Sequence, residues 1–231
     1  MKNNYFYETN FIIIFALEMN LSTKQTEEYI LQHIDEESLF LKKLTRETNL
    51  RTTNPRMISG HLQGRMLKMF CNMVVPTHIL EIGTFTGYSA LCMAESLPEN
   101  GELHTIEIND EMEEFLLGVF EESGQKDKIR LHIGDALEII PKMDLTFDVV
   151  FIDGNKRHYL EYFHAVYPKL RMGGIIIADN TLWDGHVWDT ERKDDQTQGI
   201  RRFNDYIVSD RHLEKVIVPV RDGITLIRKI K

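Results

Sequence analysis

Residues 79–91 of this 231-residue chain read ILEIGTFTGYSAL, and this stretch decides the fold. Its apolar start is typical of a buried strand, and the chain then turns through small residues between Gly83 and Gly87. The spacing of Leu91 and Met93 beyond the turn predicts a helix. A strand, a glycine loop and a helix in succession are typical of the first unit of a nucleotide-binding α/β domain.

The glycine spacing of this loop indicates its ligand. Dinucleotide-binding loops read Gly-x-Gly-x-x-Gly and P-loops end in Lys-Ser/Thr, whereas three residues separate Gly83 from Gly87. Phe85 stands where a dinucleotide glycine would admit the pyrophosphate, which argues against an NAD-linked oxidoreductase. Two acids at strand ends, Glu81 and Glu107, would bind an amino group and a ribose diol. S-adenosylmethionine, a nucleoside with a cationic amino-acid tail, satisfies both carboxylates.

Alternating apolar runs and helical patterns continue on both sides of this loop. The spacing predicts helices over residues 23–49 and 57–73, a glycine turn at 173–174, and a long polar loop over 183–198 that leads into a helix over 199–208. The nearly all-apolar run 147–152 belongs in the centre of the sheet. Further strands are predicted at 103–108, 129–133, 175–178, 213–218 and 223–230.

These elements predict an α/β fold with a doubly wound, mostly parallel seven-stranded sheet, N-terminal helices and a terminal antiparallel strand pair. We expect residues 19–231 to form a single domain, with a helical cap over 19–76 and an α/β core over 77–231. Residues 1–18 are expected to be either an over-extended gene start or a segment that packs on a partner subunit. Met19 then offers a natural start.

Composition narrows the function classes. The chain has 36 acidic and 27 basic residues and a net charge of −9, which argues against a nonspecific nucleic-acid binder. Cys71 and Cys92 lack C-x-x-C spacing, so we expect buried free thiols and a cytoplasmic location. The apolar run at 11–17 is too short to span a bilayer, so no membrane association is expected.

An acidic residue stands at or just past the end of each of the first five predicted strands: Glu81, Glu107, Asp135, Asp153 and Asp179. The carboxyl ends of parallel strands gather at one rim, where such sheets bind their ligands. A single acid of this kind can equally cap a helix. Five acids on one rim would repel one another unless cations or donors offset their charge, so together they indicate a site.

The ordered motifs resemble the cation-dependent O-methyltransferases of the catechol and caffeoyl-CoA type, which are class I S-adenosylmethionine-dependent methyltransferases with a Rossmann-like fold. The similarity spans about residues 55–231. It rests on EIGTFTGYS at 81–89, Glu107, GDA at 134–136, Asp153, and DN at 179–180. The resemblance implies cofactor contacts from Met57, Glu81, Gly83, Phe85, Thr86, Ser89, Glu107, Asp135, Ala136 and Asp153.

The same resemblance implies a metal site formed by Asp153, Asp179 and Asn180. Two carboxylates and an amide oxygen are hard ligands that suit Mg²⁺, Mn²⁺ or Ca²⁺ and disfavour zinc. Lys156 matches the family's catalytic lysine. A nearby cation would disfavour its ammonium form, so its neutral amine could act as a general base. Asn155 stands where the family often has an aspartate, which leaves the exact ligand set open.

Two further segments are candidates for binding the methyl acceptor. Trp183, Trp188 and His186 are expected to form an aromatic wall for a planar acceptor. Asn204 matches an asparagine that shapes the acceptor pocket in the family. No catalytic role is expected of His158 and Tyr159, which follow Lys156.

The sequence therefore predicts a divalent-cation-dependent O-methyltransferase that acts on a small aromatic vicinal diol and, by resemblance, a homodimer. Metal chelation would acidify the diol, and methyl transfer would depend on alignment of the oxygen with the methyl group. The alternative within the same fold is a tRNA hydroxyuridine O-methyltransferase, which the acidic charge disfavours. An NAD-linked oxidoreductase is the alternative from another class.

Overall fold

The computed structural model describes residues 25–231; residues 1–24, with the two alternatives expected for residues 1–18, lie outside the described residues. The described part of the chain divides into two units, of which the first ends at Leu39 and the second is Phe40–Lys231. In the described part of the first unit, residues 25–33 are helical, and the rings of Tyr29 and His33 stack with centroids 3.9 Å apart. The division expected at residue 76 stays a prediction.

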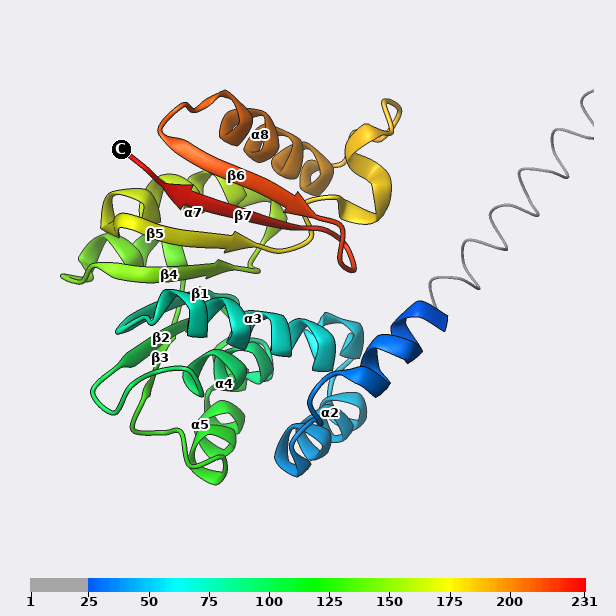
Figure 1. Ribbon diagram of the computed structural model, residues 1–231, viewed down its shortest axis with the longest axis vertical. Coiled ribbons are helices and arrows are strands. Elements are labelled where there is room, and N and C mark those ends of the chain that lie inside the picture. The colour runs from blue at the N-terminus through cyan, green and yellow to red at the C-terminus, as the bar shows by residue number, and fades with distance from the viewer. Residues whose placement is uncertain (1–24) are drawn as a thin grey trace, which may run out of the picture. The chain divides into compact units, whose positions relative to one another are not determined.

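The second unit is built on a seven-stranded sheet with the strand order β3-β2-β1-β4-β5-β7-β6 (Figure 1). The first five strands pair in parallel, and β7 runs antiparallel between β5 and β6. The predicted fold class and the terminal antiparallel pair are therefore confirmed. The strands are β1 His78–Ile82, β2 Glu102–Glu107, β3 Ile129–Ile133, β4 Phe147–Ile152, β5 Leu170–Ala178, β6 Leu213–Val218 and β7 Ile224–Lys229.

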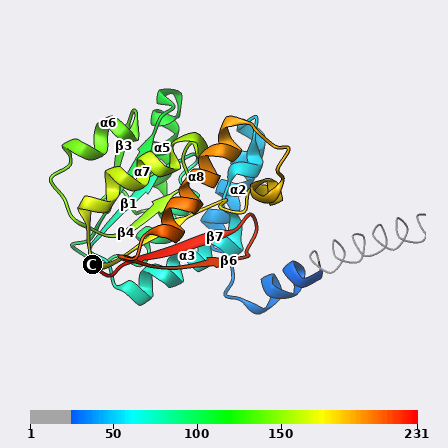
Figure 2. The same ribbon diagram turned by 90° about the horizontal axis from the view of Figure 1, so that it is seen from above.

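Helices lie on both faces of the sheet (Figure 2). The α-helices are α2 Leu39–Arg51, α3 Gly60–Val74, α4 Tyr88–Ala94, α5 Glu113–Glu122, α6 Ala136–Ile139, α7 Tyr159–Val166 and α8 Asp195–Ser209. Short 3₁₀ turns join them at η1 Pro55–Met57, η2 Asp110–Met112, η3 Ile140–Lys142, η4 Lys156–His158, η5 Tyr167–Lys169 and η6 Trp183–Trp188.

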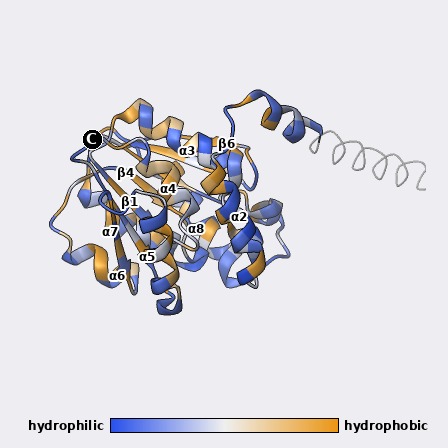
Figure 3. Cartoon of the chain, turned by 90° about the horizontal axis from the view of Figure 1, so that it is seen from below, coloured by the Kyte–Doolittle hydropathy of each residue, from blue (hydrophilic) through white to orange (hydrophobic). Residues whose placement is uncertain are grey.

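Strand β4 shows why the sheet needs two covering layers. Val149 and Phe151 belong to the apolar layer that contains α3, α4 and α5, while Val150 and Ile152 belong to the layer that contains α6, α7 and α8. All four side chains are fully buried. Alternate residues of a strand point to opposite faces, so an uninterrupted apolar run is stable only in the middle of a covered sheet. Figure 3 shows hydrophobic residues concentrated toward these central strands.

The predicted glycine turn at 173–174 is wrong, because both glycines lie inside β5. The register between β4 and β5 shifts opposite them, between Phe147 and Val149. A Cβ on Gly174 would lie 3.0 Å from the carbonyl oxygen of Asp148. The glycine pair therefore marks an irregularity where two strands approach closely, which is another common use of glycine in a strand.

The predicted loop over 183–198 is also wrong in part. Residues 183–188 form the kinked turn η6, and α8 begins at Asp195. Asp194 caps this helix, because its Oδ1 accepts a hydrogen bond of 3.0 Å from the main-chain N–H of Thr197. The polar residues that suggested a loop are thus partly the cap and first turn of the helix.

Cys71 and Cys92 are free and buried, as predicted, and burial raises the pKa of the Cys71 thiol to about 12. Within residues 25–231, no helix has both the length and the apolar character needed to cross a membrane.

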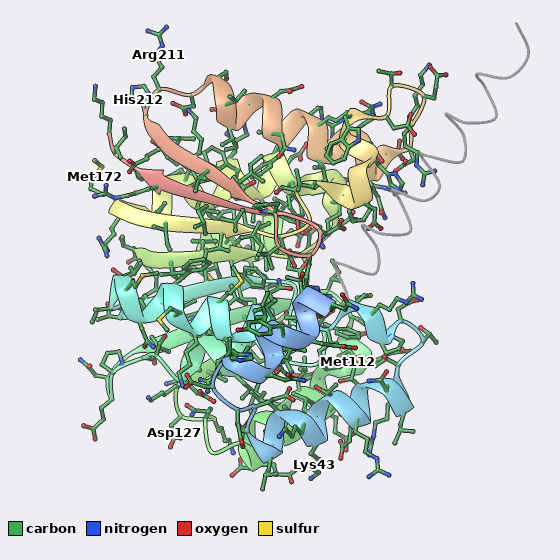
Figure 4. All side chains as sticks on the ribbon, turned by 45° about the vertical axis from the view of Figure 1, so that its right-hand side comes forward. Lys43, Met112, Asp127, Met172, Arg211 and His212 are labelled. Carbon is green, nitrogen blue, oxygen red and sulfur yellow. The ribbon has the colours of Figure 1, made fainter. Side chains whose placement is uncertain are left out.

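The amino ends of β5 and β6 lie on one side of the molecule (Figure 4). They are marked there by Met172, near the start of β5, and by Arg211 and His212, just before β6. The ligand-binding rim is at the other end.

Candidate active site

A cavity of about 1070 Å³ opens at the carboxyl ends of the parallel strands. It is lined by residues that follow four of them: Gly83 after β1, Glu107 at the end of β2, Asp153 after β4 and Asp179 after β5. Three of the five strand-end acids therefore meet in one cavity. Glu81 and Asp135 do not line it.

The two glycines of the first loop have left-handed backbone angles, with φ of +98° at Gly83 and +86° at Gly87. A Cβ on Gly83 would lie 2.6 Å from the carbonyl oxygen of Asp153, and one on Gly87 would lie 2.9 Å from the ring of Phe120. Both positions thus require glycine for its conformation and for close packing within the protein. The Gly83 contact also fixes the cofactor loop directly against the strand end that carries Asp153.

Glu107 holds the shape of this loop. Its Oε2 accepts a hydrogen bond of 2.8 Å from the main-chain N–H of Phe85, and its Oε1 accepts one of 2.9 Å from that of Asn109. Phe85 itself has a φ of 51°, so the loop is bent sharply toward Glu107. The carboxylate lines the cavity and keeps further lone pairs for a ligand.

Glu81 lies beneath the loop and is fully buried. Its Oε2 accepts a hydrogen bond of 2.5 Å from Thr105, while its Oε1 has no partner in the described structure. Burial raises the pKa of Glu81 to about 8. A buried carboxyl group with one unpaired oxygen is costly, which is the kind of strain that ligand sites retain.

The remaining predicted cofactor residues fall into two groups. A small pocket adjoins the large cavity and brings together Met57, Gly83, Phe85, Thr86, Ser89 and Asp153. Asp135 and Ala136 lie outside both pockets. Asp135 caps α6, since its Oδ1 accepts a hydrogen bond of 2.8 Å from the N–H of Leu137. An adenine contact from Asp135 and Ala136 stays a prediction.

Asp153, Asp179 and Asn180 all line the large cavity. Asp179 is only 5% exposed, and its Oδ1 and Oδ2 accept hydrogen bonds from the N–H of Asn180 (2.8 Å) and from Nε2 of Gln63 (2.6 Å). Burial, followed by the negative charge of Asp153, raises the pKa of Asp179 to about 6. Two neighbouring carboxylates and an amide oxygen fit a hard divalent cation, which would offset this repulsion.

Lys156 is 9% exposed and lies beside these acids. Its Nζ donates hydrogen bonds to Oδ1 of Asp153 (2.7 Å) and to the hydroxyl oxygen of Tyr159 (2.8 Å). The Tyr159 hydroxyl in turn donates to the main-chain oxygens of Asp179 (3.0 Å) and Ile152 (3.2 Å). Tyr159 therefore fixes the lysine against two strand ends, a role that the sequence analysis missed. Its position three residues after Lys156 was the available signal.

Gln63 and Arg221 were also missed. Gln63 is fully buried on the otherwise apolar inner face of α3, and a polar residue in that pattern was a signal for a buried partner. Arg221 lies in the turn between β6 and β7, far from the motifs in sequence, and lines the cavity.

Only part of the expected acceptor wall is present. Trp183 lines the cavity, but Trp188 is 68% exposed and packs on Gly185, and neither Trp188 nor His186 lines the cavity. The prediction of a three-residue aromatic wall is therefore wrong. Asn204 also lies off the cavity, where its Nδ2 donates a hydrogen bond of 2.8 Å to the main-chain oxygen of Thr181. Asn204 therefore holds the loop after Asn180 through its main chain without lining the cavity.

Backbone strain concentrates around this cavity. Six non-glycine residues in the described part of the chain have a positive φ. All but Val75 line the cavity: Phe85, Asn180, Trp183, Asp184 and Arg221. Left-handed angles cost free energy in residues with a Cβ and persist where the surrounding structure imposes them, most often at functional sites.

Comparisons with known proteins agree with this geometry. The O-methyltransferase family model matches residues 31–230. Caffeoyl-CoA O-methyltransferase 1 of Eucalyptus globulus is 32% identical over 221 residues, which cover 87% of this chain and 88% of the relative. The caffeoyl-CoA O-methyltransferase of Stellaria longipes is 30% identical over 225 residues, 91% of this chain and 92% of the relative.

Solved structures show the same architecture. The O-methyltransferase TomG of Streptomyces achromogenes, in complex with S-adenosylmethionine, has a TM-score of 0.84 and 29% identity over 90% of this chain and 96% of its own. The methyltransferase PaMTH1 of Podospora anserina, bound to S-adenosylhomocysteine, has a TM-score of 0.83 and 25% identity over 91% of this chain and 96% of its own. The strand-end cavity, the glycine loop and these relatives lead to one conclusion: the chain belongs to the O-methyltransferase family and is an O-methyltransferase.

Proposed function

We propose that this enzyme transfers a methyl group from S-adenosylmethionine to one hydroxyl of a small aromatic vicinal diol, with the help of a divalent cation. The observation that carries the proposal is the group formed by Asp153, Asp179, Asn180 and Lys156 in the cavity that also borders the glycine loop. TomG in complex with S-adenosylmethionine and the caffeoyl-CoA O-methyltransferases support the choice of cofactor and of a phenolic acceptor.

The cofactor would lie along the loop from Gly83 to Ser89. Glu107 has lone pairs free on both oxygens beyond its main-chain partners, so it would accept the hydroxyls of the ribose. Met57, which is 56% exposed, and Ser89 border the adjoining pocket, where the methionine end would lie. Glu81 would act from beneath the loop, where a positive amino group would offset the burial that raises the pKa of Glu81 and would favour the ionised carboxylate, as a phosphate would not.

Asp153, Asp179 and Asn180 would hold the cation. When bound, a divalent ion lowers the pKa of an acceptor hydroxyl and so favours its deprotonation near neutral pH. Lys156, which lines the cavity, would take this proton at Nζ, and its contacts with Asp153 and Tyr159 hold that nitrogen beside the proposed cation site. Transfer to the oxygen then requires only that oxygen and methyl carbon be close and aligned.

Trp183 supplies the planar face for the ring of the acceptor. The alternative acceptor is a hydroxyuridine in tRNA, and the exposed Arg56 and Arg157 at the cavity could meet its phosphates. The net charge of −9 weighs against this alternative, so the small aromatic diol is preferred. A homodimer in the cytoplasm is the expected setting.

Methyl transfer from labelled S-adenosylmethionine tests the proposal. We expect transfer to a simple catechol that is lost with EDTA and restored by excess Mg²⁺ or Mn²⁺, and no transfer to bulk tRNA. Calorimetry should show binding of S-adenosylhomocysteine and none of NAD. Labelling of tRNA but not of catechols would show that the acceptor is a tRNA hydroxyuridine and not a small aromatic diol. Activity that is insensitive to EDTA would exclude the proposed role of the cation.

A further inference from the structure

A chain of three side chains joins distant parts of the sequence beneath the proposed cation site. Nε2 of Gln63, in α3, donates a hydrogen bond of 2.6 Å to Oδ2 of Asp179. Oε1 of the same amide accepts a hydrogen bond of 2.7 Å from Nη1 of Arg221, in the turn between β6 and β7. Gln63 is fully buried, so it has no solvent to replace either partner.

The chemistry of the three groups allows only one arrangement. A guanidinium group only donates hydrogen bonds, and an ionised carboxylate only accepts them. The amide of Gln63 therefore has to present its oxygen to Arg221 and its nitrogen to Asp179. Without Arg221, the buried amide oxygen would lose its donor, and the carboxylate of Asp179 alone would fix the orientation of the amide.

Arg221 is held in a position that is costly on other grounds. Its φ of 49° is left-handed. Its Nη1 also donates to the carbonyl oxygens of Ile58 (3.2 Å) and Ser59, just before α3, where the dipole of the helix disfavours a cation. The first turn of α3 contains no acidic residue that would compensate this charge. The amide oxygen of Gln63 is the one side-chain acceptor that the described structure gives to this guanidinium.

We infer that Gln63 is a positioning residue that orients the Asp179 carboxylate for cation binding, and that Arg221 acts on Asp179 only through Gln63. This inference rests on the proposed function, in which Asp179 is a ligand of the cation. Hydrogen-bond partners of metal ligands commonly change metal affinity by about 10- to 100-fold. We expect about a 10-fold loss in Gln63→Met and a smaller loss, of about 3-fold, in Arg221→Met.

The experiment is a Mn²⁺ titration of the full-length protein with S-adenosylhomocysteine present, in which the electron paramagnetic resonance signal reports free Mn²⁺. The variants are Gln63→Met, Arg221→Met, the double variant and Asp179→Ala. Arg228→Met is the matched control, because Arg228 lies in β7 of the same hairpin and pairs at the surface with Glu214. Thermal melts of each variant, and calorimetric titration of each variant with S-adenosylhomocysteine, verify that it is folded. Arg221 is exposed, so its variant remains informative if Gln63→Met folds poorly.

We expect Arg228→Met to bind Mn²⁺ like the wild type and the double variant to bind no more weakly than Gln63→Met alone, as a shared path requires. Wild-type affinity in Gln63→Met, while Asp179→Ala loses Mn²⁺, would overturn the inference and leave the proposed function standing. Independent, multiplying effects in the double variant would show that Arg221 does not act through Gln63. Unchanged binding in Asp179→Ala would refute the cation site and the inference together.

Discussion

The acids at the ends of β1 and β2 and those after β4 and β5 are compensated in different ways. Glu107 accepts two main-chain N–H groups, and Glu81 accepts one neighbouring hydroxyl. Asp153 is paired with the side chain of Lys156, and Asp179 accepts from Gln63 as well as from the adjacent main chain. Glu107 is held by main-chain groups of the loops that follow β1 and β2, whereas Glu81 accepts only from the side chain of Thr105 in the neighbouring strand.

This difference separates two uses of the same residue type. Main-chain donors are fixed when the loop folds, so Glu107 mainly sets the shape of the cofactor loop. Side-chain donors from other elements can move or exchange partners, so the charge on Asp153 and Asp179 remains available to a ligand. The sheet rim thus has a shape-determining side and a charge-bearing side, and mutations on the two sides should have different signatures.

The largest effect is expected on the charge-bearing side. Asp179→Ala removes a proposed ligand and should lower kcat by on the order of 10³-fold, because several kcal/mol of charge stabilisation are lost. Affinity for S-adenosylhomocysteine should stay within about threefold, since Asp179 lies outside the pocket next to the loop. Steady-state kinetics and calorimetry measure both. Asp210→Ala, at the opposite end of the sheet, is the control, and wild-type kcat in Asp179→Ala would contradict the comparison.

The next effect concerns the lysine and its support. Lys156→Met should lower kcat by about 10²-fold or more, as loss of a general base does. Tyr159→Phe keeps the ring packed and removes only the hydroxyl, so we expect roughly a tenfold lower kcat with an unchanged KM for the cofactor. Tyr167→Phe, whose hydroxyl donates to the main chain of Lys231, is the control. Equal kcat in Tyr159→Phe and wild type would show that the Tyr159 hydroxyl does not position Lys156 for catalysis.

On the shape-determining side, Glu81→Gln should raise stability and weaken cofactor binding. The folded-state pKa of Glu81 is raised to about 8, so the native protein holds a proton that the unfolded chain releases above about pH 4.5. Wild-type stability therefore falls as pH rises from about 4.5 to 8, and glutamine removes this loss. Urea unfolding of the protein without cofactor should show a gain that grows to a few kcal/mol at pH 8.

Calorimetry should show S-adenosylhomocysteine bound about tenfold more weakly by the same Glu81→Gln variant, if the carboxyl group contributes to the amino-group contact. A pH-independent stability difference would contradict the raised pKa of Glu81, and unchanged affinity would assign Glu81 to folding alone.

The smallest effect is expected away from both sides. Val75 has a φ of 53° at the end of α3 and is 72% exposed, so Val75→Gly relieves a left-handed strain without creating a cavity. We expect a gain of about 0.5–1 kcal/mol in the free energy of unfolding, measured by urea denaturation, with unchanged kcat. Asn180→Gly is the contrast, because the same relief at the cavity should cost activity. Loss of stability in Val75→Gly would show that the strain is not real.

The sequence by itself determined the fold class, the terminal strand pair and the positions of most strands. Apolar runs of strand length, alternating with helical spacing and interrupted by glycine, are local signals that need no knowledge of the partner segments. The strand-end acids Glu107, Asp153 and Asp179 could be predicted for the same reason, because the carboxyl ends of parallel strands must share a rim.

Only the tertiary structure decided which polar residues share the cavity. Asp135 and Glu81 carry the same strand-end signal as Asp153, yet one caps a helix and the other lies buried under the loop. Gln63 bonds to Asp179 although 116 residues separate them in sequence, and Arg221 bonds to Gln63 across a separation of 158 residues. Hydrogen bonds between such distant segments depend on how whole elements pack, and no local periodicity in the sequence encodes them.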